Sequence, residues 1–481
     1  MDYASVILFL ALYYIRPQEW IGWVTVLKPV TWSMALALTT MLLRHRGLTF
    51  RDVFKMPHDW MMLAFFLWIV GSAPAPRQTM GAVYNVFVFY VVTVQCLSTM
   101  KRVQSFLNWW AVMIFIVAVL ALASEYGFDP MQSKDVTQFL MKGRLVLNTS
   151  IFNNPNALGH SVVPVVFMLY YTLFWKQPVF AKIGSIPIMC LPLYCIYLTI
   201  SKGAFVSGFG MAAITMALGR PKVVQLLTLI VALTIGWAAL LLLPRMEEIN
   251  EAGTDEAIRG RVEAFKWGLH NFETRTAGVG FGRFKVTFVA AHGYVKASHS
   301  AYNQIGCELG YPGLYLFLAI VYYSLRTLIT ARTHNIQEER VRRILFVLIL
   351  AYLISSWMVD FAFRATFFLF TAAIAAFHRL LVQSELSETD SISERTLPLT
   401  TNLVGTGSDT APALANADLG FTQPAAAIPE TTAVLSPQDE SKSAILPPRL
   451  NWNRVHWFDF VIIALMTVGT VRFWEYVISV M

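Results

Sequence analysis

Three cations of this 481-residue chain stand where a charge is costly or where an anion could be held. Lys202 follows a very short connection in ISKGAFVSG, and a charge close to a bilayer costs about 2.5 to 3.5 kcal/mol on insertion scales. Arg261 lies in the amphipathic stretch GRVEAFKWGLHNF, and Arg144 lies in a segment that is otherwise poor in charge. Anion binding is one interpretation. The alternatives are snorkelling of Lys202 to the interface and solvation or salt bridging of the two arginines.

A histidine just ahead of another apolar segment adds a candidate general base. His299 stands in SHSAYNQ, and a neutral imidazole with an ordinary pKa of about 6.5 can accept a proton from a hydroxyl at ambient pH. An ordinary interfacial histidine is the structural alternative. His160, His270 and His292 compete with it for the catalytic assignment.

The motifs that the sequence lacks narrow the reaction. We find no P-loop, no HExxH, no GxSxG and no carboxylate cluster for a divalent cation, so we expect no metal and no cofactor. AGVGFGRF at 277–284 has closely spaced glycines but follows a polar helix, which favours a tight turn over a dinucleotide site. Cations and an imidazole without metal ligands suit a diphosphate leaving group that side chains alone neutralise.

The composition places these residues in a membrane protein. Hydrophobic residues make up 56% of the chain and charged residues 14%, and the mean hydropathy is +0.55, which is far from soluble averages. Apolar runs long enough to cross about 30 Å of hydrocarbon recur, and they are continuous rather than alternating, which predicts helices. The net charge of +8 is scattered among short connections, so we expect no nucleic-acid partner.

The apolar runs predict an all-α polytopic membrane protein with about 12 to 13 transmembrane helices. The candidate spans are residues 2–15, 30–43, 60–72, 81–98, 106–124, 157–175, 184–200, 203–218, 223–243, 301–325, 344–359, 366–382 and 457–474.

Basic residues gather in the connections on one side of these spans. Five connections on that side hold 15 Lys and Arg residues, whereas four short connections on the other side hold 5. The five are 44–57, 99–105, 175–183, 219–223 and 326–343, and the four are 16–29, 73–80, 201–203 and 359–365. The positive-inside rule then predicts a bacterial inner-membrane protein with its N-terminus in the cytoplasm.

We expect three parts along the chain. Residues 1–382 form a transmembrane domain with outward, periplasmic loops at 125–156 and 244–300, the second of them lying between the ninth and tenth spans. Residues 383–455 are rich in Ser, Thr, Pro and Ala, which predicts a disordered cytoplasmic linker. Residues 456–481 form a transmembrane helix or, because they contain Asp459, Arg472 and Glu475, an interfacial one.

Five short motifs resemble those of the O-antigen ligase and polymerase superfamily, and most closely the exosortase A-associated O-glycosylation ligases. The resemblance covers about residues 1 to 382. The motifs are FNNPNALG at 152–159, SKGAF at 201–205, GRVEAFKWGL at 260–269, GVGFGRF at 278–284 and HSAYNQIGCELGYPGL at 299–314. The resemblance implies a glycosyltransferase fold of the membrane-embedded C type and transfer of a glycan from undecaprenyl diphosphate to a periplasmic acceptor.

The resemblance also implies roles for individual residues. Arg261 would contact the diphosphate, and His299 would be the catalytic histidine. The family has an arginine where this chain has Lys202, so the charge is kept but the planar fork is lost. We expect Arg144 to help orient the donor. We expect the substrate loops to include Asn156, also a candidate helix N-cap, with Gly280, Gly282 and Tyr302.

The predicted activity is metal-independent glycan transfer with inversion at the anomeric carbon, to an acceptor hydroxyl such as a Ser or Thr of an exported protein. Three alternatives stay open. A polymerase would join repeat units from the same donor. A transporter or flippase would move lipid-linked sugars without chemistry, although its usual midplane charges and inverted repeats are not evident. An assembly scaffold would use the linker as its docking segment.

Overall fold

The computed structural model describes residues 2–44, 50–241, 256–396 and 455–480, and every regular element in these ranges is helical. Each candidate span coincides with one long helix. These helices are α1 (Asp2–Tyr14), α4 (Pro29–Arg44), α6 (Pro57–Gly71), α7 (Pro76–Cys96), α8 (Met100–Glu125), α10 (Pro155–Leu169, continued by η2, Tyr170–Phe174), α11 (Val179–Leu198), α12 (Lys202–Ala217), α13 (Lys222–Leu241), α16 (Ala301–Thr330), α17 (Ile336–Ser355), α18 (Ala365–Thr396) and α19 (Trp457–Val480).

Seven described helices are long and apolar enough to cross a membrane by length and composition. They are α7, α8, α10 with η2, α11, α16, α18 and α19. Of the remaining long helices, α6 packs into the bundle, as Phe65 shows by its complete burial. The expected all-α polytopic membrane protein is thereby confirmed.

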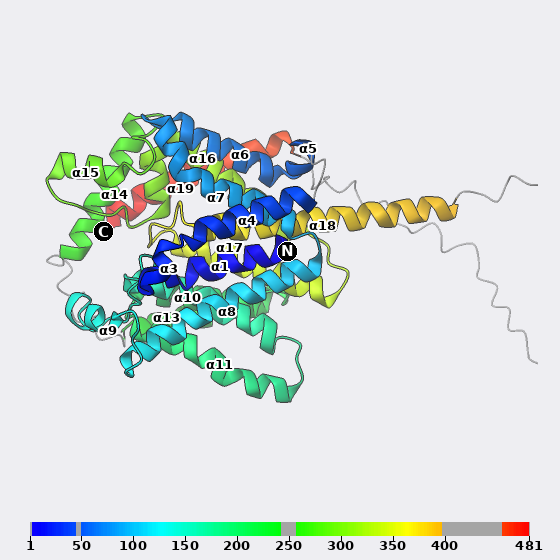
Figure 1. Cartoon of the computed structure of the whole chain (residues 1–481), viewed down its shortest axis with the longest axis horizontal. Helices are drawn as coiled ribbons and strands as arrows, with labels where there is room; N and C mark the ends of the chain where they lie inside the picture. The colour runs from blue at the N-terminus through cyan, green and yellow to red at the C-terminus, as the bar shows by residue number, and fades with distance from the viewer. Residues whose placement is uncertain (1, 45–49, 242–255, 397–454, 481) are drawn as a thin grey trace, which may run out of the picture. The chain divides into compact units, whose positions relative to one another are not determined.

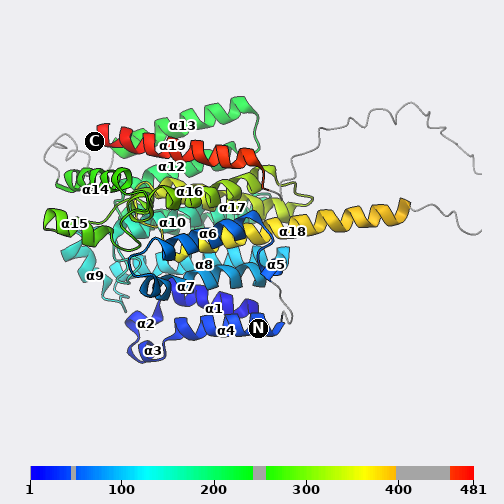
Figure 2. The same cartoon turned by 90° about the horizontal axis from the view of Figure 1, so that it is seen from above.

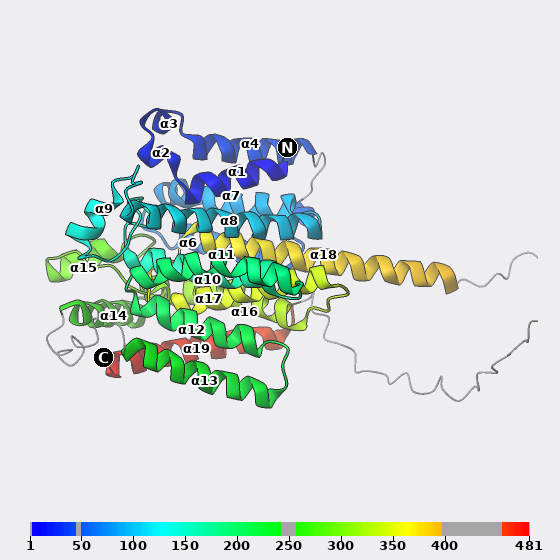
Figure 3. The ribbon, with the colours of Figure 1, turned by 90° about the horizontal axis from the view of Figure 1, so that it is seen from below.

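The long helices of the unit formed by Met1–Val382 and Trp452–Met481 alternate in direction along the chain (Figures 1, 2 and 3). One end of this bundle carries the short helices, and we call it the loop end. The short helices there are α2 (Pro17–Trp20), α3 (Gly22–Val26), α9 (Ser133–Asp135) with η1 (Val136–Leu140) and α15 (Phe284–His292), and the longer α14 (Glu256–Thr274) lies at the same end. The first predicted long loop, 125–156, and the described part of the second, 256–300, therefore lie at the same end. Residues 244–255 of the second loop lie outside the described residues. The opposite end carries α5 (Phe50–Val53).

The helix α16 is broken at Gly310, whose φ of 64° and ψ of −161° are not helical. Pro312 lacks an N–H, and the N–H of Tyr311 donates instead to the carbonyl of Thr276 at 3.2 Å, so the carbonyls of Glu308 and Cys307 lose their usual helical partners. The glycine-rich segment 277–284, which we call the glycine turn, satisfies these carbonyls. The N–H of Val279 donates to the carbonyl of Cys307 at 2.9 Å, and the N–H of Gly280 donates to the carbonyl of Glu308 at 2.8 Å. The break thus fixes the turn against α16.

The C-terminal helix α19 packs along α16 and reaches α14. Asp459 near its start is fully buried and accepts a hydrogen bond from Tyr322 at 2.7 Å and an ion pair from Arg326 at 2.8 Å. Trp474 near its other end is also fully buried, against Gly306. Asp459, one of the three charges that suggested an interfacial helix, is therefore satisfied by Arg326 inside the protein, whereas Arg472 and Glu475 pair with each other at 2.8 Å.

The predicted linker, 383–455, differs from expectation at its start. Helix α18 continues to Thr396, so residues 383–396 are helical. The rest of that segment, up to residue 454, lies outside the described residues.

Candidate active site

The first cluster of site residues joins the loop before α10 to the start of α12. Asn156 accepts two hydrogen bonds at its side-chain oxygen, from Arg144 at 2.9 Å and from Ser201 at 2.8 Å. Arg144 also donates to the carbonyl of Thr199 at 3.1 Å. This arrangement places the Arg144 guanidinium beside the residues that precede Lys202.

The predicted N-cap at Asn156 is wrong. The side chain of Asn154 caps α10 by accepting from the N–H of Asn156 at 2.8 Å, and Pro155 occupies the first helical position. Proline is favoured there because its missing N–H would have no helical partner anyway. Asn156 lies one residue further along, which frees its side chain to hold Arg144 and Ser201.

Close contact between α10 and α12 places Gly203, the neighbour of Lys202, against the buried His160. A Cβ built on Gly159 would lie 2.9 Å from Cβ of Ala204, and one on Gly203 would lie 2.7 Å from Nε2 of His160. Glycine is needed at both positions for the two helices to approach so closely. Lys202, the neighbour of Gly203, is therefore held at this helix junction.

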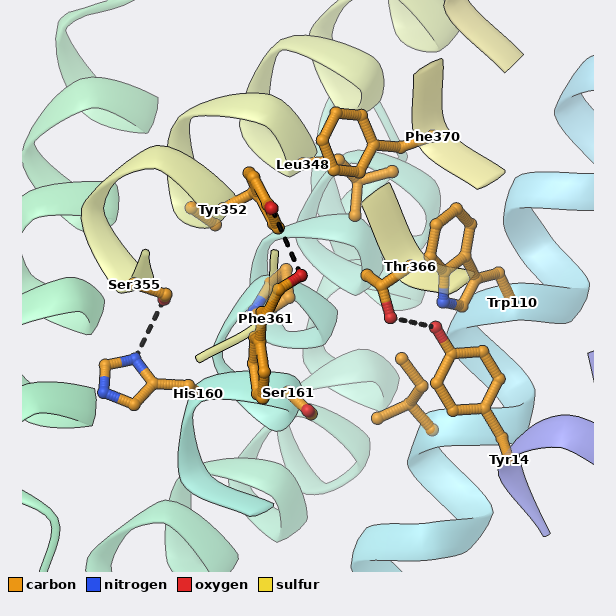
Figure 4. Close-up of a pocket in the computed structure, with 13 residues that line it drawn as sticks. Tyr14, Trp110, His160, Ser161, Leu348, Tyr352, Ser355, Phe361, Thr366 and Phe370 are labelled. Carbon is orange, nitrogen blue, oxygen red and sulfur yellow. Dashed lines mark hydrogen bonds between the residues drawn. The ribbon is translucent and has the colours of Figure 1, made fainter. Parts of the chain in front are cut away.

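His160 links this junction to α17. Its Nδ1 lies 2.9 Å from the hydroxyl of Ser355, beside a small cavity of about 30 Å³ (Figure 4). Its Nε2 is buried without a hydrogen-bond partner in the part of the chain that the structure describes. Ser356, which follows Ser355, connects this region to the segment of His299. Its carbonyl accepts a hydrogen bond from the hydroxyl of Ser300, the residue after His299, at 2.9 Å.

His299 has an unusual backbone conformation. Its φ of 54° lies in the left-handed region, and it is flanked by two buried serines, Ser298 and Ser300. Ser300 is the N-cap of α16 and accepts from the N–H of Asn303 at 3.4 Å. Such a conformation costs on the order of 1 to 3 kcal/mol and persists only where the surroundings enforce it. Here the cap and the Ser356 contact do so.

Asn303 joins the segment of His299 to the helix of Arg261. Its amide donates to the carbonyl of Ala264 on α14 at 3.0 Å and to the carbonyl of Ser298 at 2.9 Å. Its side chain also fills the space that a Cβ on Gly268 would need. Arg261, one turn before Ala264, interacts electrostatically with both His299 and His160. The charge of Arg261 therefore acts on both histidines.

The surroundings lower the pKa of His299 to about 4. Burial has the largest effect because it disfavours the charged imidazolium, and the positive charges of Arg261, Lys296 and Lys285 act in the same direction. The imidazole is therefore neutral at ambient pH and retains a lone pair that can accept a proton. Lys296 also lies against Gly260, next to Arg261.

A polar cavity of about 310 Å³ adjoins the histidine through Ser298 and Lys285. Gly282 lines it and donates its N–H to the carboxylate of Glu308 at 2.9 Å. Asp360 and Arg364 contribute further charges to its wall. The cavity has the size of a pocket for a small ligand.

The remaining expected loop residues lie elsewhere. Gly280 is pressed against α16, and a Cβ there would lie 2.6 Å from Pro74. Tyr302 is buried, stacks on Trp357 with ring centroids 4.5 Å apart, and donates to the carbonyl of Leu353 at 3.3 Å. Both residues support the site from behind and do not line the polar cavity.

Two of the three competing histidines differ from His299 in that they are exposed. His270 is exposed on α14, and His292 is exposed at the end of α15, where it stacks on Phe288. Sequence reasoning missed Lys296, Lys285 and Ser355. Only the spacing of Lys296, three residues before His299, could have drawn attention to it.

A family model described as O-antigen ligase matches residues 187–318. The match covers Lys202, Arg261, the glycine turn and His299, but not Arg144 or Asn156. No curated protein matches the chain. The match supports a relationship to the O-antigen ligase superfamily and a membrane protein with ligase-like function.

Proposed function

We propose, with this relationship to the O-antigen ligases as the premise, that the chain is a glycosyltransferase that moves a glycan from undecaprenyl diphosphate to an acceptor hydroxyl. The observation that supports the proposal is that Arg261 interacts electrostatically with both His299 and His160, and that His160 packs against Gly203, the neighbour of Lys202. The acceptor would be a Ser or Thr of an exported protein, in keeping with the motifs' resemblance. The loop end would face the periplasm.

The reaction would transfer one proton and break one glycosidic bond. His299 takes the proton of the acceptor hydroxyl as its oxygen attacks the anomeric carbon from the side opposite the diphosphate. The bond between that carbon and the phosphate oxygen breaks, and undecaprenyl diphosphate leaves with the electron pair. Arg261, Lys202 and Arg144 would stabilise the charge on the leaving group, and the proton passes from His299 to water. No metal ion takes part in the proposed steps.

Donor binding would also adjust the base. The cations that lower the pKa of His299 include Arg261, which the proposal assigns to the diphosphate. A bound diphosphate offsets that positive charge, so the pKa of His299 would rise toward its ordinary value. The histidine would then be a stronger base when the donor is in place.

The decisive experiment uses purified protein in lipid nanodiscs with a lipid-linked glycan donor and a hydroxyl-bearing peptide acceptor. Substituting His299→Ala should lower the transfer rate by about 10²- to 10⁴-fold, the usual contribution of a positioned general base. His270→Ala, at an exposed histidine of the same end, should transfer at the wild-type rate. Wild-type activity in His299→Ala would remove the histidine from the mechanism.

Two further arms distinguish the alternatives. Donor alone should give no longer lipid-linked chains, because only a polymerase would build them. Chelation with EDTA should leave transfer intact, and strong inhibition would contradict a site made of cations and an imidazole.

A further inference from the structure

Two cavities at the loop end share a wall. The polar cavity of about 310 Å³ beside Ser298 and a second cavity of about 350 Å³ are both lined by Phe363 and Arg364. These two residues lie in the connection just before α18. Both volumes fall in the range of pockets that hold small ligands. The shared residues therefore stand between two ligand-sized spaces.

The guanidinium of Arg364 lies over the ring of Phe361 and interacts electrostatically with Tyr13. Within the described ranges its guanidinium has neither a hydrogen-bond nor an ion-pair partner, and its ring contact is with Phe361 at 5.9 Å. The side chain is only partly exposed. A partly desolvated guanidinium that the protein leaves without an anion is a feature of sites that bind one from outside.

The other charges around the two cavities are mostly committed. Arg16, in the second cavity, is paired with Glu19 at 2.5 Å, and that carboxylate also accepts from the hydroxyl of Ser150 at 2.8 Å. The carboxylate of Glu308 accepts from Gly282 at 2.9 Å and from Phe284 at 3.1 Å. Arg364 is thus the cation of the shared wall that remains available to a ligand.

The rest of the lining fits a carbohydrate. The polar cavity offers the amide of Gln304 and the carboxylate of Asp360, and the second cavity offers Gln18 and Asn85. Amides and carboxylates bind sugar hydroxyl groups, which donate and accept at once. The walls of the second cavity also include apolar side chains such as Phe89, against which a sugar ring can pack.

We infer that Arg364 recognises an anionic group, a carboxylate or a phosphate, on the glycan that the transfer reaction moves. The glycan is the substrate concerned because its anomeric carbon must lie near His299, and the polar cavity that Arg364 lines also contains Ser298, the neighbour of His299. The identification as the transferred glycan rests on the proposed function. The anion site itself rests only on the cavities and the charge.

The test is a binding measurement that needs no catalysis. Glucuronic acid, glucose 6-phosphate and neutral glucose are titrated against the full chain in nanodiscs, and saturation-transfer NMR gives each Kd. The two acidic sugars should bind the wild type more tightly than glucose. Arg364→Gln should weaken them about 10- to 100-fold and leave glucose binding unchanged. The tighter of the two acidic probes shows whether carboxylate or phosphate is preferred.

Arg77→Gln is the matched control, because Arg77 is an exposed arginine at the start of α7 that lines neither cavity. It should bind all three probes as the wild type does. If the glutamine variant at 364 fails to fold, Arg364→Lys replaces it. Lysine keeps the charge but loses the planar fork, so binding of the acidic probes alone should weaken.

Two results would overturn the inference: equal binding of acidic and neutral sugars by the wild type, or unchanged acidic-sugar binding in Arg364→Gln. A third result would separate the two proposals. If the wild-type chain transfers no glycan but Arg364→Gln still loses acidic-sugar binding, the proposed function is refuted and the anion site stands.

Discussion

His299 combines an exceptional backbone with an exceptional electrostatic environment. Its backbone is in the left-handed region, and Ser298, Ser300 and Asn303 hold that conformation through buried hydrogen bonds. Burial of the ring, together with three nearby cations, lowers its pKa and keeps it neutral. Each feature has a cost in the folded state, and together they leave an uncharged imidazole beside positive groups. A site for a basic side chain and an anionic ligand needs this combination.

The first prediction at the residue scale concerns pH. Because the free protein holds the pKa of His299 at about 4, the base is lost only when the pH falls through about 4. We therefore expect kcat/KM, which reports the free enzyme, to stay level from neutral pH to about 5 and to fall below that. The acidic limb of kcat should lie at higher pH, since the bound diphosphate offsets the cations.

The measurement is a pair of pH–rate profiles for transfer. Lys296→Gln provides a check, because removing one of the charges that lower the pKa should move the kcat/KM limb to higher pH. Coincident limbs near 6.5 for both parameters would show that the surroundings do not act on the histidine as described.

Residue types could be predicted from the sequence better than residue partners. Lys202, Arg261 and His299 drew attention because a charge or imidazole stood beside apolar sequence. The contributions of Ser355, Lys296 and Arg364 could not be predicted, since each depends on packing between segments distant in sequence. The N-cap was misplaced by two residues, from Asn154 to Asn156, because both asparagines flank the same proline.

At the scale of elements, the glycine turn and the broken helix form one structure. The turn was expected from its glycines, but its purpose is visible only in α16, where Gly310 and Pro312 release carbonyls that the turn satisfies. The sequence contained both halves of this arrangement. It could not show that they meet, because hydrogen bonds between distant backbones leave no mark in side-chain patterns.

Substituting Gly278→Ala tests this contact. Gly278 has a φ of 74°, and a Cβ there would lie 2.5 Å from the backbone carbon of Glu308, which cannot move aside as a side chain could. Gly293→Ala is the control, because Gly293 has a similar φ of 81° with open space around it. Both variants carry about 1 to 2 kcal/mol of backbone strain, and only the first adds a clash.

We therefore expect the melting temperature of purified Gly278→Ala to fall clearly further than that of Gly293→Ala. Equal losses in the two variants would mean that the turn does not approach α16 as closely as the structure has it.

At the scale of the whole unit, hydropathy and charge predicted the helices and their alternation well. Each of the candidate spans became a helix because an apolar run in a bilayer has no other way to satisfy its backbone. Which helices pack against one another could not be predicted from the sequence. The sequence left α19 open between spanning and interfacial, and its burial depends on Arg326 and Gly306, residues of another helix.

The buried pair between Arg326 and Asp459 provides the last prediction. Its side chains are only 10% and 0% exposed, so removing one charge leaves the other desolvated and unpaired. Asp459→Asn should therefore lower the stability of the unit by about 3 to 5 kcal/mol. The same helix holds a matched pair, Arg472 and Glu475 at 2.8 Å, with side-chain exposures of 75% and 35%. Glu475→Gln should change the stability little, because water already solvates that pair.

Thermal unfolding of both variants in nanodiscs measures the difference, and limited proteolysis shows its location. Asp459→Asn should loosen the packing of α19 along α16, and Trp474 at the other end of α19 would then move away from α14. We therefore expect the segment of α14 beside Trp474 to become accessible to protease. Equal melting temperatures in the two variants would mean that α19 lies outside the packed bundle. Because Trp474 fills the space beside Gly268 and Asn303, such a result would also remove the support that α19 gives to the segment of His299.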